Sequence, residues 1–432
     1  MASDTKTATE RRAAIDTGLR SLSSVAPSAA RHLASAVAPL GGRAFLVGGG
    51  VRDHLLSRPC KDFDIEVFGV GIDDLAKVLR AHGRVNAVGK SFGVLKWRPR
   101  GVAPGDDLDV SIPRRDSKVG RGHRGIAVEG DPDMPIEEAA RRRDLTVNAL
   151  MYDLLADELV DPYDGLTDLR RGTLRAVDRT TFLEDPLRAL RVVQFAARLS
   201  FAVSDDLIEL CREARLDELP AERIQGEWAK LLLKSARPSH GLAIARATQV
   251  LQRVFPAAAG LERDAVLDRA AARRDALTPE GRRWALMLLA WLGPLPTATV
   301  EDTLDRLWLH TWQGYPLRKA VLAAHRHQGA HRATDADLRR LAVHAEVGLV
   351  LGLSDAEGCP LPEAEARADA LGILTEPCPR LLLGRHLKEL GIPPGRHMGP
   401  LLATVYDAQL AGEVTTVEDA KALAAEHWAS LA

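Results

Sequence analysis

Three acidic residues alternate with three apolar ones in the segment Asp62-Phe63-Asp64-Ile65-Glu66-Val67. A period of two predicts a β-strand whose acidic side chains share one face while the apolar ones face a core. Two carboxylates one residue apart on one face, Asp62 and Asp64, suit Mg²⁺, which prefers oxygen ligands. The same pattern also fits an amphipathic edge strand with an acidic face in water.

A second candidate strand, Asp107-Leu108-Asp109-Val110-Ser111, offers Asp109 as a third carboxylate, with Asp107 as the rival. Phosphoryl transfer with two metal ions needs such a cluster, because one ion activates the attacking hydroxyl and the other steadies the leaving pyrophosphate. Asp109 could instead be a simple surface residue. The predicted catalytic and metal-binding set is Asp62, Asp64 and Asp109.

A glycine triplet, 48–50, follows the apolar run 45–47 and precedes a stretch of helical character, 51–56. Glycines at a strand-to-helix turn let the backbone approach a phosphate closely, and the helix start supplies free N–H groups. Arg52, one turn into that helix, could add a guanidinium fork to the same phosphate. A glycine triplet in such a turn can also be merely structural.

The sequence pattern, and with it the predicted type of secondary structure, changes along the chain. Residues 8–39 have helical composition. Short apolar runs separated by glycines then predict a helix at 72–82 and strands at 45–47, 63–68, 92–97 and 108–112. Residues 113–136 lack periodicity and are rich in Gly, Pro and charge, which predicts a long loop.

From about residue 137 onward the pattern is almost wholly helical. Its breaks fall near 162–165, Pro220, Pro256, Gly293-Pro294 and 392–395. The chain therefore reads as a mixed α+β head followed by a long helical body.

Composition narrows the class of protein. With 46% hydrophobic and 27% charged residues, the chain can build real cores under a charged surface. A formal net charge of −1 means that any nucleic-acid site must be a local patch. Four cysteines without a C-x-x-C pair argue against a zinc knuckle and fit a reducing compartment. No apolar run approaches a membrane span, so we expect a cytoplasmic protein.

Six motifs follow one another along the chain: GGGVRD (48–53), DFD (62–64), RRDLTVNAL (142–150), DPYDGLTDLRRGTLRAV (161–177), EDPLRALRVVQFAAR (184–198) and ERIQGEWAKLL (222–232). With these motifs in this order, the chain resembles the bacterial-type (class II) tRNA nucleotidyltransferase and poly(A) polymerase family, part of the polymerase-β-like superfamily. The resemblance covers roughly residues 43–256. It implies a small polymerase-β-like head with a mixed sheet, followed by an elongated all-α neck, body and tail.

The resemblance also implies roles for individual residues. Asp62 and Asp64 would bind the metals. The nucleotide would be bound by Gly48, Gly49, Arg52, Arg143, Asp144, Asn148, Asp185, Arg188 and Arg191. Many relatives carry a further arginine where this chain has Gln194, which puts one triphosphate or tRNA contact in doubt.

Asp185 and Arg188 bear on base selection. Their spacing, with Arg191 three residues further on, predicts that all three lie within one sector of a helix. An acceptor and a donor side by side can read the hydrogen-bonding edge of a base, at about 1–3 kcal/mol for each good bidentate contact. Asp185 could also cap the helix beside Pro186, and the two roles are compatible.

Basic residues suggest where RNA could bind. The loop at 113–136 carries Arg114, Arg115, Lys118, Arg121 and Arg124. The tail adds Arg385, Lys388 and Arg396 as candidate phosphate contacts. Both groups of basic residues could instead be ordinary charged residues exposed to water.

Some relatives carry a metal-dependent HD phosphohydrolase after the neck, but this chain has no His-Asp dipeptide. We interpret His325, His327 and His331 as structural or surface residues rather than as metal ligands. The resulting division is an N-terminal helical extension (1–40), a catalytic head (41–175), a neck with the templating helix (176–256), a degenerate HD-like body (257–350) and a possible tRNA-binding tail (351–432).

The resemblance implies addition of CCA to tRNA 3′ ends from CTP and ATP, with two Mg²⁺ ions and no nucleic-acid template. Its partners would be the tRNA 3′ end and the two nucleotides, and no protein partner is implied. Addition of CC only, of the terminal A only or of a poly(A) tail stays open. The pair Asp185 and Arg188, which would select the base as a template does, is common to all of these activities. An HD phosphohydrolase is disfavoured, and a noncatalytic RNA-binding protein on the same scaffold is the alternative from another class.

Overall fold

The computed structural model describes residues 7–60, 63–86, 94–103, 105–118 and 126–431. The chain divides into two compact units. Unit 1 comprises Met1–Glu227 and His240–Val254, and unit 2 comprises Trp228–Ser239 and Phe255–Ala432. The finer division into five parts stays a prediction.

The described part of unit 1 contains a seven-stranded mixed sheet with the order β3-β4-β5-β2-β1-β8-β9. Its strands are β1 (Arg43–Val47), β2 (Asp64–Phe68), β3 (Gly83–Asn86), β4 (Val94–Pro99), β5 (Leu108–Ser111), β8 (Met151–Asp153) and β9 (Glu158–Val160). The four strands predicted from apolar runs are confirmed. Strand β2 lies in the middle, antiparallel to β1 and parallel to β5. The edge-strand alternative for the acidic segment is therefore wrong.

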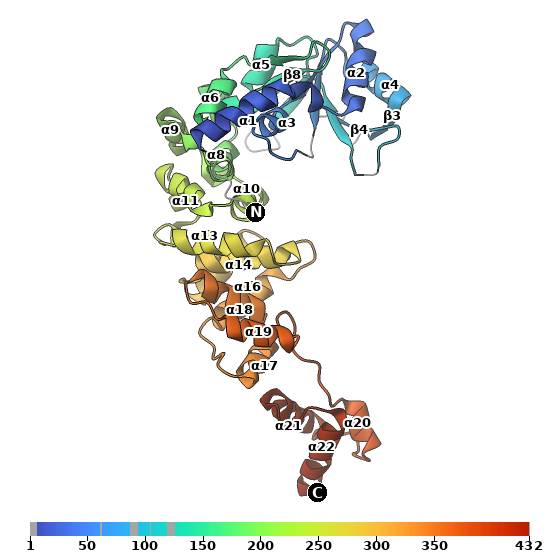
Figure 1. Ribbon diagram of the computed structural model, residues 1–432, viewed down its shortest axis with the longest axis vertical. Helices are drawn as coiled ribbons and strands as arrows, with labels where there is room; N and C mark the ends of the chain where they lie inside the picture. The colour runs from blue at the N-terminus through green and yellow to red at the C-terminus, as the bar shows by residue number, and fades with distance from the viewer. Residues whose placement is uncertain (1–6, 61–62, 87–93, 104, 119–125, 432) are drawn as a thin grey trace. The chain divides into compact units, whose positions relative to one another are not determined.

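Helices cover both faces of this sheet (Figure 1). On one face, Phe45, Val47 and Phe68 form a core with Ala139 and Ala140 of α5 (Ile136–Arg141). On the other, α2 (Ser28–Val37) contacts β1 and α4 (Ile72–His82) contacts β4. Helix α4 has the predicted bounds, with acidic residues in its first turn and basic ones in its last, as the helix dipole favours.

The segment predicted as a long loop contains an antiparallel hairpin, so that prediction is wrong. Strand β6 (Arg114–Lys118) pairs with β7 (Ile126–Gly130), and 119–125 between them lie outside the described residues. Because β6 consists of charged and polar residues, it has no apolar alternation to signal a strand. The backbone hydrogen bonds to its partner define it instead.

The expectation of an almost wholly helical chain after residue 137 is also wrong near its start. Strands β8 and β9 complete the sheet, with β8 pairing along β1. A short apolar run such as Ala149 to Leu155 cannot be assigned to helix or strand from periodicity alone. Its pairing with β1 makes this run a strand rather than a helix.

The rest of unit 1 is mainly helical. Helices α1 (Ala8–Arg20) and α3 (Gly49–Leu55) precede β2. After the sheet come α6 (Gly165–Arg171), α7 (Arg179–Glu184), α8 (Leu187–Leu199), α9 (Asp205–Glu213) and α12 (Val250–Val254). The short strands β10 (Thr173–Leu174) and β11 (Ala202–Val203) pair with each other. Helices α10 (Ala221–Lys234) and α11 (Pro238–Ala247) each contribute residues to unit 1 and to unit 2.

The described part of unit 2 is helical. It contains α13 (Asp264–Arg274), α14 (Glu280–Leu292), α15 (Thr297–Arg306), α16 (Leu317–Arg326), α17 (Asp335–His344), α18 (Val347–Ala356), α19 (Pro362–Ala370), α20 (Gly384–Glu389), α21 (Met398–Ala411) and α22 (Val417–Leu431). Residues 284–292 of α14 are all buried, against α13, α16 and α18. The breaks predicted near 293–294 and 392–395 are confirmed. Within the described residues, no helix combines the length and hydropathy needed to span a bilayer.

Candidate functional site

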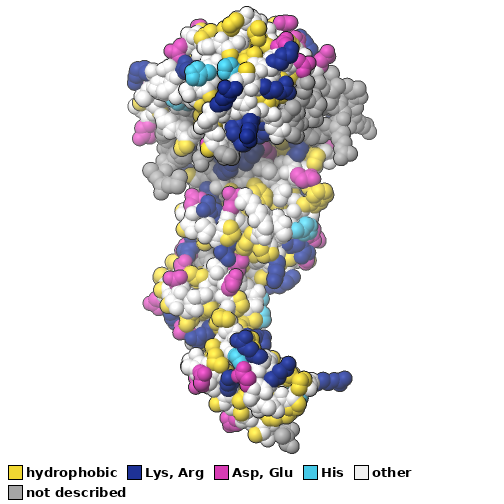
Figure 2. Space-filling model, turned by 90° about the vertical axis from the view of Figure 1, so that its right-hand side faces the viewer, with side chains coloured by type: hydrophobic (Ala, Val, Ile, Leu, Met, Phe, Trp, Pro, Cys, Tyr) yellow, Lys and Arg dark blue, Asp and Glu magenta, His cyan; other side chains and the backbone are white. Residues whose placement is uncertain are grey.

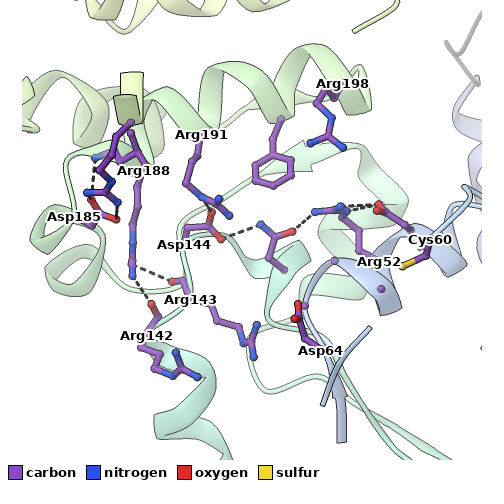
Figure 3. Close-up of a pocket in the computed structure, with 18 of the residues that line it drawn as sticks. Arg52, Cys60, Asp64, Arg142, Arg143, Asp144, Asp185, Arg188, Arg191 and Arg198 are labelled. Atoms are coloured by element: carbon purple, nitrogen blue, oxygen red, sulfur yellow. Dashed lines mark hydrogen bonds and ion pairs between the residues drawn. The ribbon is translucent and has the colours of Figure 1, made fainter. Parts of the chain in front are cut away.

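Unit 1 contains a cavity of about 700 Å³ (Figure 3). All nine predicted nucleotide-binding residues line it, and so does Asp64. Its full lining is Gly48, Gly49, Gly50, Arg52, Asp53, Pro59, Cys60, Asp64, Arg142, Arg143, Asp144, Asn148, Asp185, Leu187, Arg188, Arg191, Phe195, Arg198 and Arg223. This described lining includes seven arginines and four aspartates, so the cavity attracts anions although the whole chain is almost neutral.

The glycine turn forms one wall. Gly48 has φ +72°, a conformation that favours glycine, and α3 starts at the next residue. A Cβ atom on Gly48 would lie 3.0 Å from Nη1 of Arg143, and one on Gly49 would lie 3.5 Å from Nη2 of Arg52. Two guanidinium groups therefore stand close to the bare backbone of the turn, where a phosphate group would be shared between them.

The acidic residues follow the register of the sheet. Asp64 is exposed at the start of β2, and its Cα partner on β5 is Asp109. Partners on neighbouring strands share a face, so the two carboxylates point to the same side. Asp109 does not line the cavity, its Oδ1 has no hydrogen bond, and Nζ of Lys96 lies 3.5 Å from that atom. Asp62 lies outside the described residues.

The rival carboxylate is already occupied. Asp107 accepts two hydrogen bonds from Arg98, at 2.6 and 3.1 Å, which lower the pKa of Asp107. Of the two candidates on this segment, Asp109 is the one that lies opposite Asp64 in the strand register.

Glu66 departs from the sequence prediction. It does not belong to a solvated acidic face, because it is only 1% exposed. Its carboxylate accepts hydrogen bonds from Arg142 and, at 3.4 Å, from Nη2 of Arg143. A buried carboxylate is tolerated when it is paired, and this pairing holds the Arg143 side chain in the cavity wall.

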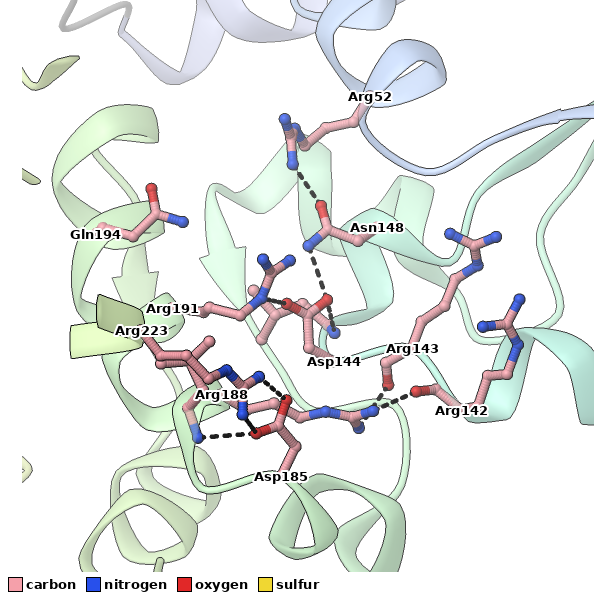
Figure 4. Close-up of polar contacts among 12 residues, drawn as sticks. Arg52, Arg142, Arg143, Asp144, Asn148, Asp185, Arg188, Arg191, Gln194 and Arg223 are labelled. Carbon is pink, nitrogen blue, oxygen red and sulfur yellow. Dashed lines mark hydrogen bonds and ion pairs between the residues drawn. The ribbon is translucent and has the colours of Figure 1, made fainter. Parts of the chain in front are cut away.

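A polar chain runs across the cavity (Figure 4). Nε of Arg191 donates to Asp144 at 2.6 Å, and Nδ2 of Asn148 donates to the other Asp144 oxygen at 2.9 Å. Arg52 in turn donates to the side-chain oxygen of Asn148 and, at 2.8 Å, to the carboxylate of Asp53. Burial alone would raise the pKa of Asp144, but Arg191 and Asn148 outweigh burial and the pKa is lowered.

Asp185 lies before α8, in extended conformation, so the prediction that it shares a helical sector with Arg188 and Arg191 is wrong. Its carboxylate accepts from the N–H of Leu187, the first residue of α8, at 3.2 Å, while the N-cap position itself is Pro186. It also accepts two hydrogen bonds from Arg223, at 3.1 and 2.9 Å. Proline at 186 ends α7 and turns the chain, which explains the departure.

Arg188 is held by backbone oxygens rather than by Asp185. It donates to the carbonyl of Arg143 at 3.3 Å and to that of Arg142 (Figure 4). Its guanidinium thereby links α8 to the end of α5. The two predicted templating residues face the same cavity from adjacent positions, each already oriented by a partner.

Three arginines of the cavity were missed by the sequence analysis: Arg142, Arg198 and Arg223. Arg142 and Arg223 stand in the quoted RRDLTVNAL and ERIQGEWAKLL motifs, but neither was given a role. Arg198 lies seven residues after Arg191, which places it on the same face of α8. That spacing was the available signal.

The predicted RNA-binding residues are scattered. Arg115 donates to Asp131 at 3.0 Å and to Glu138, so it ties the hairpin to α5. The Arg121 and Arg124 positions lie outside the described residues, as does the side chain of Lys118. In unit 2, Arg385, Lys388 and Arg396 are exposed, and Figure 2 shows Lys and Arg side chains on the surface of the C-terminal helices. RNA binding by these residues stays a prediction.

Of the three histidines considered as metal ligands, His325 and His327 have structural partners, and His331 is exposed. His325 is 5% exposed, with its ring nitrogens 3.1 Å from the Thr297 hydroxyl and 3.1 Å from the Gly293 carbonyl. His327 stacks on His344. Among the described residues, no group of three or more His, Cys, Asp or Glu side chains is arranged to hold a metal ion.

Comparison with known proteins decides the family. The poly A polymerase head domain matches residues 44–175. The CCA-adding enzyme of Pseudomonas entomophila is 36% identical over 274 residues, which cover 60% of this chain and 68% of that protein. The chain belongs to the CCA-adding enzyme family.

Other members of the CCA-adding enzyme family match a smaller part of their length. The multifunctional CCA proteins of Aromatoleum aromaticum and Stenotrophomonas maltophilia are 36% and 38% identical. The matches cover 57% and 49% of this chain, and the chain spans only 62% and 51% of those two proteins.

Solved structures extend the likeness in fold to both units. A CCA-adding enzyme of Bacillus stearothermophilus in complex with CTP has a TM-score of 0.71 at 22% identity, covering 93% of this chain and 97% of that one. The Thermotoga maritima CCA-adding enzyme complexed with tRNA has a TM-score of 0.65 at 22% identity, covering 93% and 94%. The α+β head and helical remainder predicted from the sequence are confirmed as the fold of this family.

Proposed function

We propose that this protein adds CCA to tRNA 3′ ends by nucleotidyl transfer from CTP and ATP, without a nucleic-acid template. The observation that carries the proposal is the cavity in which the glycine turn, Asp64 and seven arginines converge. The RNA 3′ hydroxyl attacks the α-phosphate of the nucleotide, a new phosphodiester bond forms, and pyrophosphate leaves.

Binding of the triphosphate is assigned to the arginines nearest the glycine turn. Arg52 and Arg143 stand against Gly49 and Gly48, so both can donate to phosphate oxygens that approach the bare backbone. Arg191 contributes through the Asp144 carboxylate, which also fixes Asn148. This network would hold the sugar and triphosphate in one orientation.

Mg²⁺ fits the acidic side of the cavity. Asp64 and Asp109 face the same side from paired positions, and the buried Oδ1 of Asp109 has no hydrogen bond, with Nζ of Lys96 at 3.5 Å as its ion-pair partner. Carboxylate oxygens are the ligands this ion prefers. With Asp62, which the family resemblance adds, these residues would hold two ions, whose chemistry is to lower the charge on the attacking and leaving oxygens.

Base selection is assigned to Asp185 and Arg188. Arg223 keeps the Asp185 carboxylate oriented, and the carbonyls of Arg142 and Arg143 orient the Arg188 guanidinium. A base would meet one fixed acceptor and one fixed donor, as it would on a pairing partner. Relatives whose structures contain CTP and ATP support these two nucleotides as substrates.

The test is an addition assay on tRNA that ends at the discriminator base, supplied with single labelled nucleotides and Mg²⁺. We expect incorporation of two C and then one A, and none by the Asp62→Ala/Asp64→Ala variant. Growth that stops at CC, or an added A alone, would assign a partial activity, and a long A tail would assign poly(A) synthesis. If the double variant adds nucleotides as well as the parent, the proposal is wrong.

Two rivals give different results in the same assay. A noncatalytic RNA-binding protein binds the tRNA without extending it. A phosphohydrolase releases phosphate from 2′,3′-cyclic ends. The location of the protein in the cytoplasm stays a prediction from composition.

A further inference from the structure

Arg198 differs from the other cavity arginines in its partners. Arg52, Arg191 and Arg223 each pair with an aspartate, while Arg142 and Arg143 share Glu66. Arg188 is held by two carbonyl oxygens. Among the described residues, Arg198 has no carboxylate within 4.0 Å, and the acceptor for its guanidinium is Oε1 of Gln194, 3.1 Å from Nη1. It is a half-buried cation that no described carboxylate contacts directly.

Gln194 is placed to aim Arg198. It lies four residues earlier on α8, one turn away, and is only 1% exposed. Its Nε2 is buried without a hydrogen bond, so the side chain sacrifices one polar group while its carbonyl faces the guanidinium. The reverse amide orientation would set donor against donor. Gln194, which does not line the cavity itself, thus fixes a residue that does.

One aromatic ring gathers Arg198 with the residues assigned to the nucleotide. The guanidinium carbons of Arg52, Arg191 and Arg198 lie 4.9, 5.2 and 5.7 Å from the centre of the Phe195 ring. In Figure 3 these three labelled side chains point into the same part of the cavity. The ring face attracts cations and offsets part of their mutual repulsion. Because Arg52 also stands against the glycine turn, a polyanion at that turn is within reach of both Arg52 and Arg198.

Burial lowers the pKa of Arg198 and the nearby charge of Arg52 lowers it further, while the carboxylates of Asp53 and Glu227 act in the opposite direction. A guanidinium partly removed from water and close to other guanidinium groups is stabilised by a bound anion. The cavity therefore contains a guanidinium that no described carboxylate contacts directly and that an anion could bind.

We propose that Arg198, positioned by Gln194, contacts a phosphate of the incoming nucleotide and forms with Arg52 a two-arginine clamp on the triphosphate. The inference rests on the proposed function, because it names a contact for that same substrate. The chemistry of the ligand is a phosphate oxyanion, which a nucleotide or the RNA backbone could supply. The position beside Arg52 and the glycine turn favours the nucleotide.

The first experiment compares Arg198→Met, which keeps the packing on Phe195, with Arg212→Met as the control. Arg212 is an exposed helical arginine of unit 1 outside the cavity, and it donates to the backbone carbonyl of Ala247. We expect Arg198→Met to raise KM for both CTP and ATP about 10-fold or more, the loss of one charge-assisted contact, with KM for tRNA unchanged. Inhibition by inorganic tripolyphosphate should weaken in parallel, and Arg212→Met should change none of these values.

The second experiment tests the positioning role. Gln194→Met should raise KM for both nucleotides less than Arg198→Met does, because the guanidinium remains but is no longer aimed. In the Arg198→Met background the same change should add nothing, since the two residues act as one unit. Independent, multiplying effects would contradict the role of Gln194.

Three outcomes overturn the proposal. The first is a rise in KM for tRNA alone, which would assign the contact to RNA. The second is an unchanged KM and tripolyphosphate affinity. The third is a loss of kcat that merely follows a lowered Tm. Binding of tripolyphosphate with Mg²⁺ is measured without RNA, so it can be compared between variants even if the parent protein adds no nucleotide to tRNA.

Discussion

Both units bury charged side chains, but they satisfy them differently. In unit 2, Arg274 is 4% exposed and donates to the backbone carbonyls of Leu232 and Ser235, at 2.5 and 2.7 Å, so it ties the end of α10 in place. In unit 1, Glu66 and Asp144 are satisfied by arginine side chains that also line a cavity. In these examples, buried charge serves packing in unit 2, whereas in unit 1 it orients side chains of the cavity wall.

The core of unit 2 illustrates the other side of this contrast. Trp228, Phe255 and Trp291 pack with ring centroids 4.5 to 5.1 Å apart, and residues 284–292 of α14 are all buried. Changes there should alter stability without altering nucleotide affinity. Changes in the cavity of unit 1 should do the reverse.

The largest effect expected is from Asp64→Asn. The amide keeps the size of the side chain but removes the charge that would hold Mg²⁺, so kcat should fall by on the order of 10³-fold or more. The Tm should stay within a few degrees of the parent, because Asp64 is exposed. Single-turnover addition of labelled CMP measures the loss. An activity within tenfold of the parent would remove Asp64 from the catalytic set.

Trp291→Ala should lower the stability of unit 2 and leave nucleotide affinity unchanged, the reverse of Asp64→Asn. The side chain is 1% exposed, and truncating a buried tryptophan costs about 3–5 kcal/mol of unfolding free energy. Urea unfolding monitored by circular dichroism measures that cost. Under conditions where the protein remains folded, KM for CTP should not change.

The matched control for Trp291→Ala is Trp308→Ala, since Trp308 is 60% exposed. An exposed substitution should stay within about 0.5 kcal/mol. Equal destabilisation by both variants would show that the aromatic cluster does not carry the stability of unit 2.

Glu66→Gln sharpens the comparison within unit 1. Glutamine offers one acceptor oxygen where the carboxylate held both Arg142 and Arg143, so one arginine loses its anchor. We expect KM for CTP and ATP to rise about 5- to 10-fold, as for the loss of one hydrogen bond, with kcat within twofold. Asp153→Asn is the control, because Asp153 is also buried, in the same sheet, and pairs with Arg43 outside the cavity. A similar rise in KM in that control would make the Glu66 effect a general loss of packing.

The smallest effect expected concerns acid. Because the pKa of Asp144 is lowered in the folded protein, its contribution to stability is complete above its unfolded pKa and is lost as pH falls through the folded value. Below about pH 4, the Tm of Asp144→Asn should therefore fall less steeply than that of the parent. Scanning calorimetry between pH 6 and 2 checks this, and parallel curves would contradict it.

Prediction from sequence succeeded where the signal is local. The strand predicted at 45–47, the turn at Gly48 and helix α4 follow from an apolar run, from glycine and from apolar spacing within a few residues. It failed at β6, whose charged residues show no period, and at β8, whose apolar run fits a helix equally well. In both cases a partner strand distant in the sequence decided the structure.

The sequence by itself identified nine nucleotide-binding candidates, carried by ordered motifs, and all nine line the cavity. The tertiary structure alone decided that Glu66 is buried, that Arg223 holds Asp185 and that Gln194 directs Arg198 into the cavity. The reason is physical. Local spacing sets the face on which a side chain stands, but its partner, its burial and hence its charge state depend on which segment packs over that face.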